Sequence, residues 1–153
     1  MNRGFGLIEI VIGGAILATV FVAVSAYYQQ SLVISRSTAH LTQASFLLEE
    51  GIEVAKIFRD TSWTNISAPV TGSSYYLTFN GTSWATSTTN TYIDGVFERK
   101  IVLSDVYRDA NDDIVSSGGV LDTGTRKATV TVSWYEKTAT TTKSISTYLT
   151  NIF

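Results

Sequence analysis

The 153-residue sequence predicts an α+β fold, with one long N-terminal helix packed against a small antiparallel sheet of about four strands. Three patterns predict this fold. They are an unbroken apolar stretch at 5–28, an amphipathic helical pattern at 29–60 and a strand-rich region at 61–153. An amphipathic helix and a sheet each have an apolar face to bury, so we expect them to pack on one another.

The stretch at 5–28 is apolar on all sides and contains a single charge, Glu9. As a helix it would be about 36 Å long, which is enough to cross a hydrocarbon core of about 30 Å. Arg3 precedes it, so the positive-inside rule favours a cytoplasmic N-terminus and an exported C-terminal part. Tyr27 and Tyr28 would lie at the far interface, where aromatic rings are enriched. We therefore expect a single membrane span.

Two simpler interpretations of this stretch are a secretory signal peptide and a plain membrane anchor. Val24-Ser25-Ala26 offers the small residues of a cleavage site, but the apolar run is longer than the usual 7–15 residues or so. A charge at the centre of a spanning helix costs about 2.5–3.5 kcal/mol, and less near an end. Neither interpretation gives a reason for Glu9, which indicates that this acid has a partner.

The residues around this acid match a known leader. The string GFGLIE at 4–9, followed by the apolar stretch, resembles the class III leader of type IV pilins and type II secretion pseudopilins. The resemblance implies a pilin-like fold, in which residues 1–4 are a leader peptide. It implies that prepilin peptidase cuts between Gly4 and Phe5 and methylates the new Phe5 amine. It also implies that Glu9 neutralises the Phe5 amine of a neighbouring subunit while the helices at 5–28 pack in a filament core.

The sequence departs from the family pattern at two places. Gly6 stands where Thr or Ser is common, which weakens the match to the peptidase substrate. No Pro lies near Ala26, where many pilins have one, so whether the helix partly melts in a filament stays open.

Small residues recur at helical spacing within the apolar stretch. Such rows let neighbouring membrane helices approach closely, although Ala and Gly are also common in any spanning helix. The two candidate helix-packing rows are Gly14 with Ala18, and Ala15 with Thr19 and Ala23.

The segment at 29–60 continues the helix with an amphipathic pattern. Its charged residues line one face, where Glu53 is spaced to pair with Lys56, and Lys56 with Asp60. Apolar residues at i, i+3, i+4 and i+7 spacing form the other face, on two adjoining rows: Leu41, Ala44, Leu48, Ile52 and Ala55, and Leu47, Val54 and Phe58.

The region at 61–153 predicts a β-rich head. Candidate strands cover 75–79, 96–106, 128–134 and 144–153, with a turn around Asn80-Gly81-Thr82. Stretches rich in Ser and Thr at 86–91 and 138–142 suit solvated loops or strand edges.

Composition narrows the function classes. The net charge of -2 predicts no general attraction to nucleic acid, and the absence of Cys excludes disulfides and thiolate chemistry. The single His, His40, has no triad partner in the sequence pattern, so we expect no enzyme and no cofactor. The basic pairs at 99–100 and 126–127 could form a DNA-contacting strip, but cross-strand pairing with nearby acids, or solvation, is favoured.

The strongest candidate for metal binding is an acidic loop. Asp109, Asn111 and Asp113 alternate as in a calcium loop, but an EF-hand requires Gly and Glu where this chain has Ile114 and Val120. A polar turn is therefore favoured, and a calcium loop of another kind stays open.

Taken with the resemblance, these patterns predict a structural subunit of a type IV pilus or related filament. The expected partners are other copies of the chain, prepilin peptidase, assembly platform proteins and the membrane. The precursor would be a single-pass protein of the cytoplasmic membrane, and the assembled form would lie at the cell surface. Two alternatives stay open: a pseudopilin of a type II secretion or DNA-uptake machine, and a membrane-anchored monomer that binds a ligand.

Overall fold

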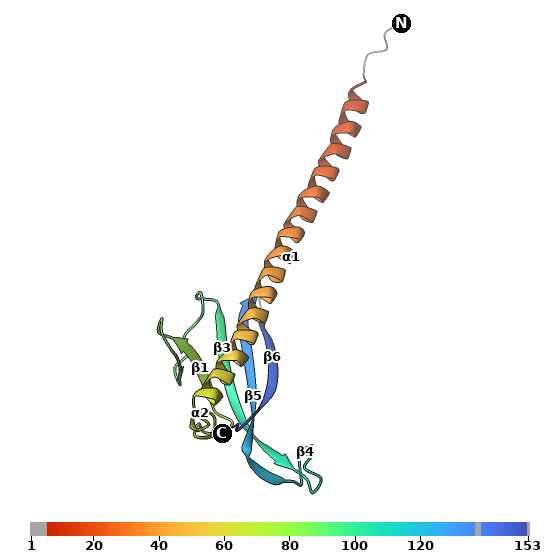
Figure 1. The fold of residues 1–153 in the computed structure, drawn as a ribbon. Coiled ribbons are helices and arrows are strands. Elements are labelled where there is room, and N and C mark those ends of the chain that lie inside the picture. The colour runs from red at the N-terminus through yellow and green to blue at the C-terminus, as the bar shows by residue number, and fades with distance from the viewer. Residues whose placement is uncertain (1–5, 137–138, 153) are drawn as a thin grey trace. The chain divides into compact units, whose positions relative to one another are not determined.

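The computed structural model describes residues 6–136 and 139–152. The chain divides into two compact units, one ending at Leu41 and one beginning at Thr42. Helix α1 (Leu7–Thr61) runs through both, and all other elements belong to the second unit. Figure 1 shows these elements in chain order.

Helix α1 is 55 residues long. The only Pro of the chain is Pro69, so no residue in the helix interrupts its backbone hydrogen bonding. The helix ends where short polar residues follow one another. Thr61 donates its hydroxyl to the Ile57 carbonyl at 2.8 Å, and Ser62 donates its N–H to the Phe58 carbonyl at 3.1 Å.

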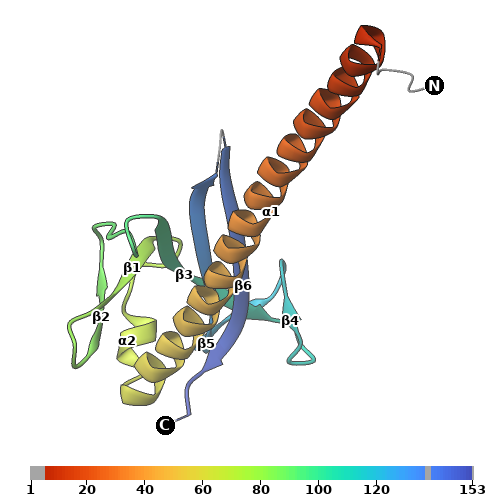
Figure 2. The same ribbon diagram turned by 90° about the horizontal axis from the view of Figure 1, so that it is seen from above.

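The second unit contains a six-stranded antiparallel sheet. The strands are β1 (Ser74–Phe79), β2 (Trp84–Ser87), β3 (Phe97–Arg108), β4 (Ile114–Val115), β5 (Val120–Glu136) and β6 (Ala139–Thr150). Their order is β2-β1-β3-β5-β6, and β4 pairs with β3 at one end. The hairpin arrangement of β5 with β6 and the separate β3–β4 extension are visible in Figure 2.

Alternate side chains of the two central strands are buried on one face of the sheet. In β3 the buried positions run from Phe97 through every second residue to Leu103. At an irregularity between Asp105 and Val106 the partner in β5 changes from Arg126 to Asp122, and beyond it Val106 is buried instead of Asp105. This is the effect of a β-bulge, because side chains alternate with a period of two.

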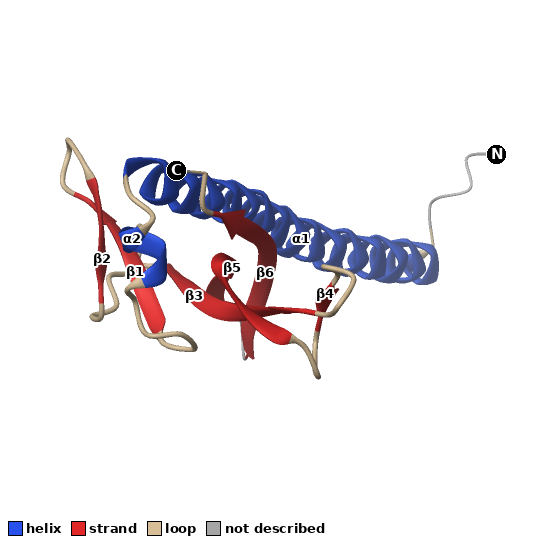
Figure 3. Cartoon of the chain, turned by 60° about the horizontal axis from the view of Figure 1, so that its bottom comes forward, coloured by secondary structure: helices blue, strands red, loops and turns tan. Residues whose placement is uncertain are grey.

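The C-terminal part of α1 covers the buried face of this sheet within the second unit, as Figure 3 shows. The predicted apolar rows account for this contact: Ala44, Val54 and Ala55 are at most 1% exposed, and Ile52 is 8% exposed. These helix residues form two core clusters with the sheet residues Leu77, Phe97, Ile101, Leu103, Ala128, Val130, Val132, Trp134 and Leu149.

The predicted order of one helix followed by antiparallel strands is present, but the sheet has six strands rather than about four. The four predicted strands correspond to β1, β3, β5 and β6. Strand β4 has only two residues, too few to show a period in the sequence, and β2 lies in a Thr-rich stretch typical of a loop. Strand β6 also begins at Ala139, earlier than predicted, because the Thr-rich segment pairs with β5.

A short helix that the sequence patterns do not predict, α2 (Thr64–Ser67), follows α1. It is a single turn, so no helical periodicity can develop in its four residues. Its Ile66 is 1% exposed and joins the main core cluster. Burial of the Ile66 side chain therefore holds this turn against the core of the second unit.

One of the two predicted ion pairs on the charged face of α1 is present. Lys56 Nζ lies 2.7 Å from Glu53 Oε1. Asp60 pairs instead with its neighbour Arg59, at 2.8 Å, so the predicted Lys56–Asp60 pair is wrong. Each pair has one side chain that is more than half exposed, so both contribute little to stability.

Candidate functional site

The N-terminal part of α1 presents a continuous apolar surface. Leu7, Leu17 and Phe21 are each more than 70% exposed. Among the described residues, α1 is the one helix long and apolar enough to cross a membrane, a property of its length and composition that signal sequences near an N-terminus share. Exposed apolar surfaces of this kind are typical of segments that contact a membrane or another protein.

Glu9 is the acidic residue in the first turn of this apolar surface. Its Oε2 accepts a hydrogen bond of 2.7 Å from the backbone N–H of Gly6. The N–H groups at a helix start lack partners within the helix and carry partial positive charge, so a carboxylate is stabilised there. A carboxylate has about four acceptor sites, so this single bond leaves Glu9 able to bind a cation as well.

The predicted processing residues, Gly4 and Phe5, lie outside the described residues. Gly6 is the first residue that the structure describes, so its hydrogen bond with Glu9 lies close in sequence to the predicted cleavage point.

The predicted helix-packing residues all lie in α1 and are exposed along its surface. The Thr19 hydroxyl donates a hydrogen bond of 2.8 Å to the Ile16 carbonyl, so this polar group has a partner within the helix. A Cβ atom added at Gly14 would meet no atom within 4 Å. Helical geometry places Gly14 next to Ala18 on one row, and Ala15, Thr19 and Ala23 on the other, as predicted from their spacing.

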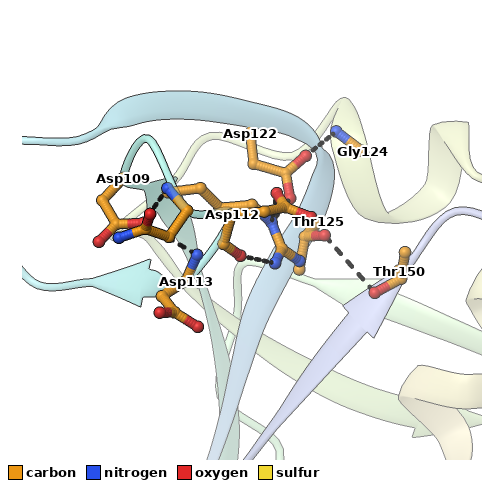
Figure 4. A network of polar contacts seen from close by, with 9 residues as sticks. Asp109, Asp112, Asp113, Asp122, Gly124, Thr125 and Thr150 are labelled. Carbon is orange, nitrogen blue, oxygen red and sulfur yellow. Dashed lines mark hydrogen bonds and ion pairs between the residues drawn. The ribbon is translucent and has the colours of Figure 1, made fainter.

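The acidic loop proposed as a cation site connects β3 to β4 and forms a turn (Figure 4). Asp109 Oδ1 accepts the backbone N–H groups of Asn111 at 2.8 Å and Asp113 at 3.1 Å. Asp112 adopts a positive φ of 68° within this turn. The polar turn expected from the sequence is present. In the described part of the chain, no group of three or more His, Asp or Glu side chains is arranged to hold a metal.

Next to this turn, Arg108 forms hydrogen bonds to the side chain of Asp122 and to the backbone of Asp112. Its Nε donates to Asp122 Oδ2 at 2.7 Å, and its Nη1 donates to the Asp112 carbonyl at 2.8 Å. The hydrogen bond from Arg108 lowers the pKa of Asp122, with help from Thr125. The same bond raises the pKa of Arg108. The network ties the β3–β4 turn to the start of β5.

The two basic sequence pairs do not form a common strip. Arg99 is 4% exposed and forms an ion pair with Glu50 of α1, whereas its neighbour Lys100 lies on the alternate face of β3. Arg126 pairs with Asp105 on the adjacent strand, at 3.0 Å. Arg126 therefore forms a cross-strand pair of the kind that the sequence favoured, whereas Arg99 pairs with the helix, which the sequence did not predict.

One feature of the second unit has no signal in the sequence. A groove lies between the last turns of α1, α2 and the β1–β2 hairpin, with a volume of about 980 Å³. Phe79 and Trp84 line it from the two strands of the hairpin, where their Cα atoms are paired. Only the observed register brings these two residues together, because a turn at 80–82 alone does not specify which residues pair.

Comparisons with models of known protein families, with characterised proteins and with solved structures find no match to this chain.

Proposed function

We propose that the chain is a structural subunit of a type IV pilus or a related filament. It enters the cytoplasmic membrane as a single-pass precursor with its N-terminus in the cytoplasm. Prepilin peptidase removes residues 1–4 and methylates the amine of Phe5. Assembly platform proteins then add the subunit to other copies of itself, with the N-terminal helices inside the filament and the β-rich heads outside.

One observation carries this proposal: an acid near the start of an otherwise apolar, exposed helix that continues into the head. Glu9 lies in the first turn of α1, and 18 residues of this helix form a window with no buried residue. Burying an unpaired carboxylate in hydrocarbon or in a helix bundle is costly. The exposed apolar helix therefore needs both a covering layer and a cation for Glu9, and other subunits supply both.

The proposed contact has a simple electrostatic basis. Cleavage after Gly4 creates a new amino group on Phe5, and this group is cationic at neutral pH even after addition of one methyl group. An ion pair between this amine and Glu9 of a neighbouring subunit fixes the axial register of two apolar helices that otherwise slide freely. Removal of one partner from such a buried pair typically costs about 3–5 kcal/mol.

The same features serve a pseudopilin of a type II secretion or DNA-uptake machine. Processing at Gly4, the spanning helix and the Glu9 contact are common to both, and the two differ in what the filament does. The groove in the head favours a second candidate, an anchored monomer that binds a ligand. The state of the N-terminus separates this monomer from both kinds of filament subunit.

The test is mass spectrometry of the mature N-terminus, on protein isolated from cells with and without prepilin peptidase. We expect a chain that starts at N-methylated Phe5 in the first case and an intact precursor in the second. A start at Tyr27 would identify a secretory signal, and retention of Met1 in cells with the peptidase would identify a permanent anchor. Either result contradicts the proposal.

A matched variant supports the interpretation of that result. Gly4→Leu places a large side chain at the cleavage point and should leave the precursor in the membrane. Gly13→Leu changes the same residue type where an added Cβ meets no atom within 4 Å, and it should be processed normally. Electron microscopy of sheared surface filaments, with the chain identified in them, then distinguishes a pilus from a short pseudopilus.

A further inference from the structure

The groove of the second unit combines three elements of the fold. Its lining residues come from the last turns of α1, from α2 with the following Ala68 and Pro69, and from the β1–β2 hairpin. Figure 2 shows these elements close together, with β2 at the sheet edge. The volume of about 980 Å³ is at the upper end of the range of about 300–1,000 Å³ that is typical of ligand sites.

The lining carries no ionisable side chain. All of its residues are described, and they are Ala, Asn, Ile, Phe, Pro, Ser, Thr or Trp. A charged ligand would have to give up its hydration here without an opposite charge in return, which is costly. The groove therefore favours an uncharged ligand.

Two aromatic rings form a platform on one wall. The rings of Phe79 and Trp84 lie with their centroids 5.1 Å apart at an interplanar angle of 41°. Phe79 is 55% exposed. The Arg99 guanidinium lies 5.3 Å from the centroid of Trp84, and Trp84 also packs on the main core cluster. The tryptophan is thus held in place, while the phenylalanine remains open to a ligand.

Residues with hydroxyl and amide groups line the same groove. They include Thr64, Thr82 and Thr86. Asn65 donates its amide to the Phe58 carbonyl at 3.2 Å, which leaves its amide oxygen as an acceptor of fixed position. A wholly apolar ligand would find an aromatic surface here but would leave these polar groups without a partner once water is displaced.

We propose that this groove binds a neutral saccharide. A sugar ring has a face of C–H groups that packs on an aromatic ring and a rim of hydroxyl groups that form hydrogen bonds. The aromatic platform and the hydroxyl and amide groups of the lining match these two properties, and the uncharged lining matches the absence of charge. The volume of the groove is large enough for several sugar units, so an oligosaccharide or a segment of a polysaccharide is the expected ligand. This inference does not depend on filament assembly.

The test uses the full chain in lipid nanodiscs, because sugar-based detergents would compete for the groove. The chain has three Trp residues, so 5-fluorotryptophan labelling gives three ¹⁹F signals, which single Trp→Phe variants assign. The probes are hexamers of α-linked glucose, β-linked glucose and β-linked N-acetylglucosamine, together with an array of neutral glycans. We expect a saturable shift of the Trp84 signal with at least one neutral saccharide, and no shift of the Trp134 signal.

Two variants and one charged probe make the result specific. Phe79→Ser removes the exposed ring and should weaken binding about two- to tenfold. Tyr135→Ser removes an exposed ring outside the groove, 66% exposed against 55% for Phe79, and should leave binding unchanged. Hexagalacturonate, the charged counterpart of the hexamer probes, should bind less well than they do.

Three outcomes would overturn the proposal. They are the absence of binding by every neutral glycan below about 10 mM, equal binding by the Phe79→Ser variant, and preferred binding of the charged hexamer. Thermal unfolding shows that each variant is folded before it is titrated. Comparing the binding of a soluble hexamer with that of the corresponding polysaccharide at equal sugar concentration then shows whether the groove binds chain ends or internal segments.

Discussion

The guanidinium of Arg99 in strand β3 forms an ion pair with the carboxylate of Glu50 on helix α1. The arginine side chain is only 3% exposed, whereas that of Glu50 is 46% exposed. The pair therefore lies at the edge of the contact between helix and sheet within the second unit. Because a buried cation is costly without a counter-charge, this contact makes the helix a condition for burying Arg99.

Substitution of the acid tests this dependence. Glu50→Ala leaves the Arg99 cation buried without its counter-charge. The described group that still attracts the cation is the Trp84 ring. We expect the free energy of unfolding to fall by about 1–3 kcal/mol. Urea denaturation of the full chain in nanodiscs, followed by tryptophan fluorescence, measures the change.

A second acid on the same helix provides the control. Glu53 pairs with Lys56, but both side chains are more than 40% exposed. Glu53→Ala should therefore change the free energy of unfolding by no more than about 0.5 kcal/mol. Equal losses in the two variants would show that the buried position of Arg99 has no influence on stability.

A second prediction concerns the closest approach of helix and sheet. A Cβ atom at Gly51 would lie 2.6 Å from Val130 Cγ1. Replacement of Gly by Ala in a helix normally adds up to about 1 kcal/mol of stability. Here the overlap forces the helix or the strand to move, so Gly51→Ala should instead lower the free energy of unfolding by about 1–3 kcal/mol. Thermal unfolding monitored by near-UV circular dichroism measures the loss.

The cause of that loss can be separated from general disruption of the core. Val130→Ala removes both methyl groups that the new Cβ would meet. The double variant should therefore lose less stability than the two single variants together, with an interaction energy of about 0.5 kcal/mol or more. Additive losses would show that the overlap at Val130 is not the reason for the Gly at 51.

The sequence predicts most of the second unit because its periodicities are strong. The alternation from Ala128 to Trp134 and the apolar rows of α1 describe the two surfaces that meet in the core. The short elements are not predictable in this way. Strand β4 forms because Ile114 and Val115 pair with Arg108 and Tyr107 of β3 across an Asp-rich turn. Helix α2 forms because its Ile66 packs in the main core cluster. Both depend on tertiary contacts rather than on a repeating pattern.

The two candidate sites also differ in whether a local sequence pattern or a tertiary contact defines them. Glu9 is conspicuous in the sequence because an acid contradicts its apolar surroundings, and a local rule suffices to find it. The groove is different, because the pairing of Phe79 with Trp84 follows from the strand register and its other wall comes from α1. No local pattern in the sequence specifies that meeting of three elements.

A third prediction follows from the lowered pKa of Asp122. The hydrogen bonds from Arg108 and Thr125 stabilise its charged form in the folded state, below the ordinary pKa of 3.8. The resulting stability is fully present above pH 3.8 and is lost as the pH falls through the lower folded-state pKa. Asp122→Asn should therefore reduce stability at neutral pH and flatten its decline below pH 3.8. Asp113→Asn, an exposed change in the adjacent turn, should leave the acid profile of the original chain.

The last prediction concerns the acid of the apolar helix. Glu9→Gln keeps the size of the side chain and its ability to accept the Gly6 N–H, but it removes the charge. If Glu9 neutralises the Phe5 amine of a neighbouring subunit, the variant should be inserted and cleaved normally, yet its incorporation into filaments should fall at least about tenfold, because a buried ion pair has lost one charge. Immunoblots of membrane and sheared-filament fractions measure both steps. Normal filaments containing the Gln variant would exclude the ion pair and leave Glu9 only its hydrogen bond to the start of its own helix.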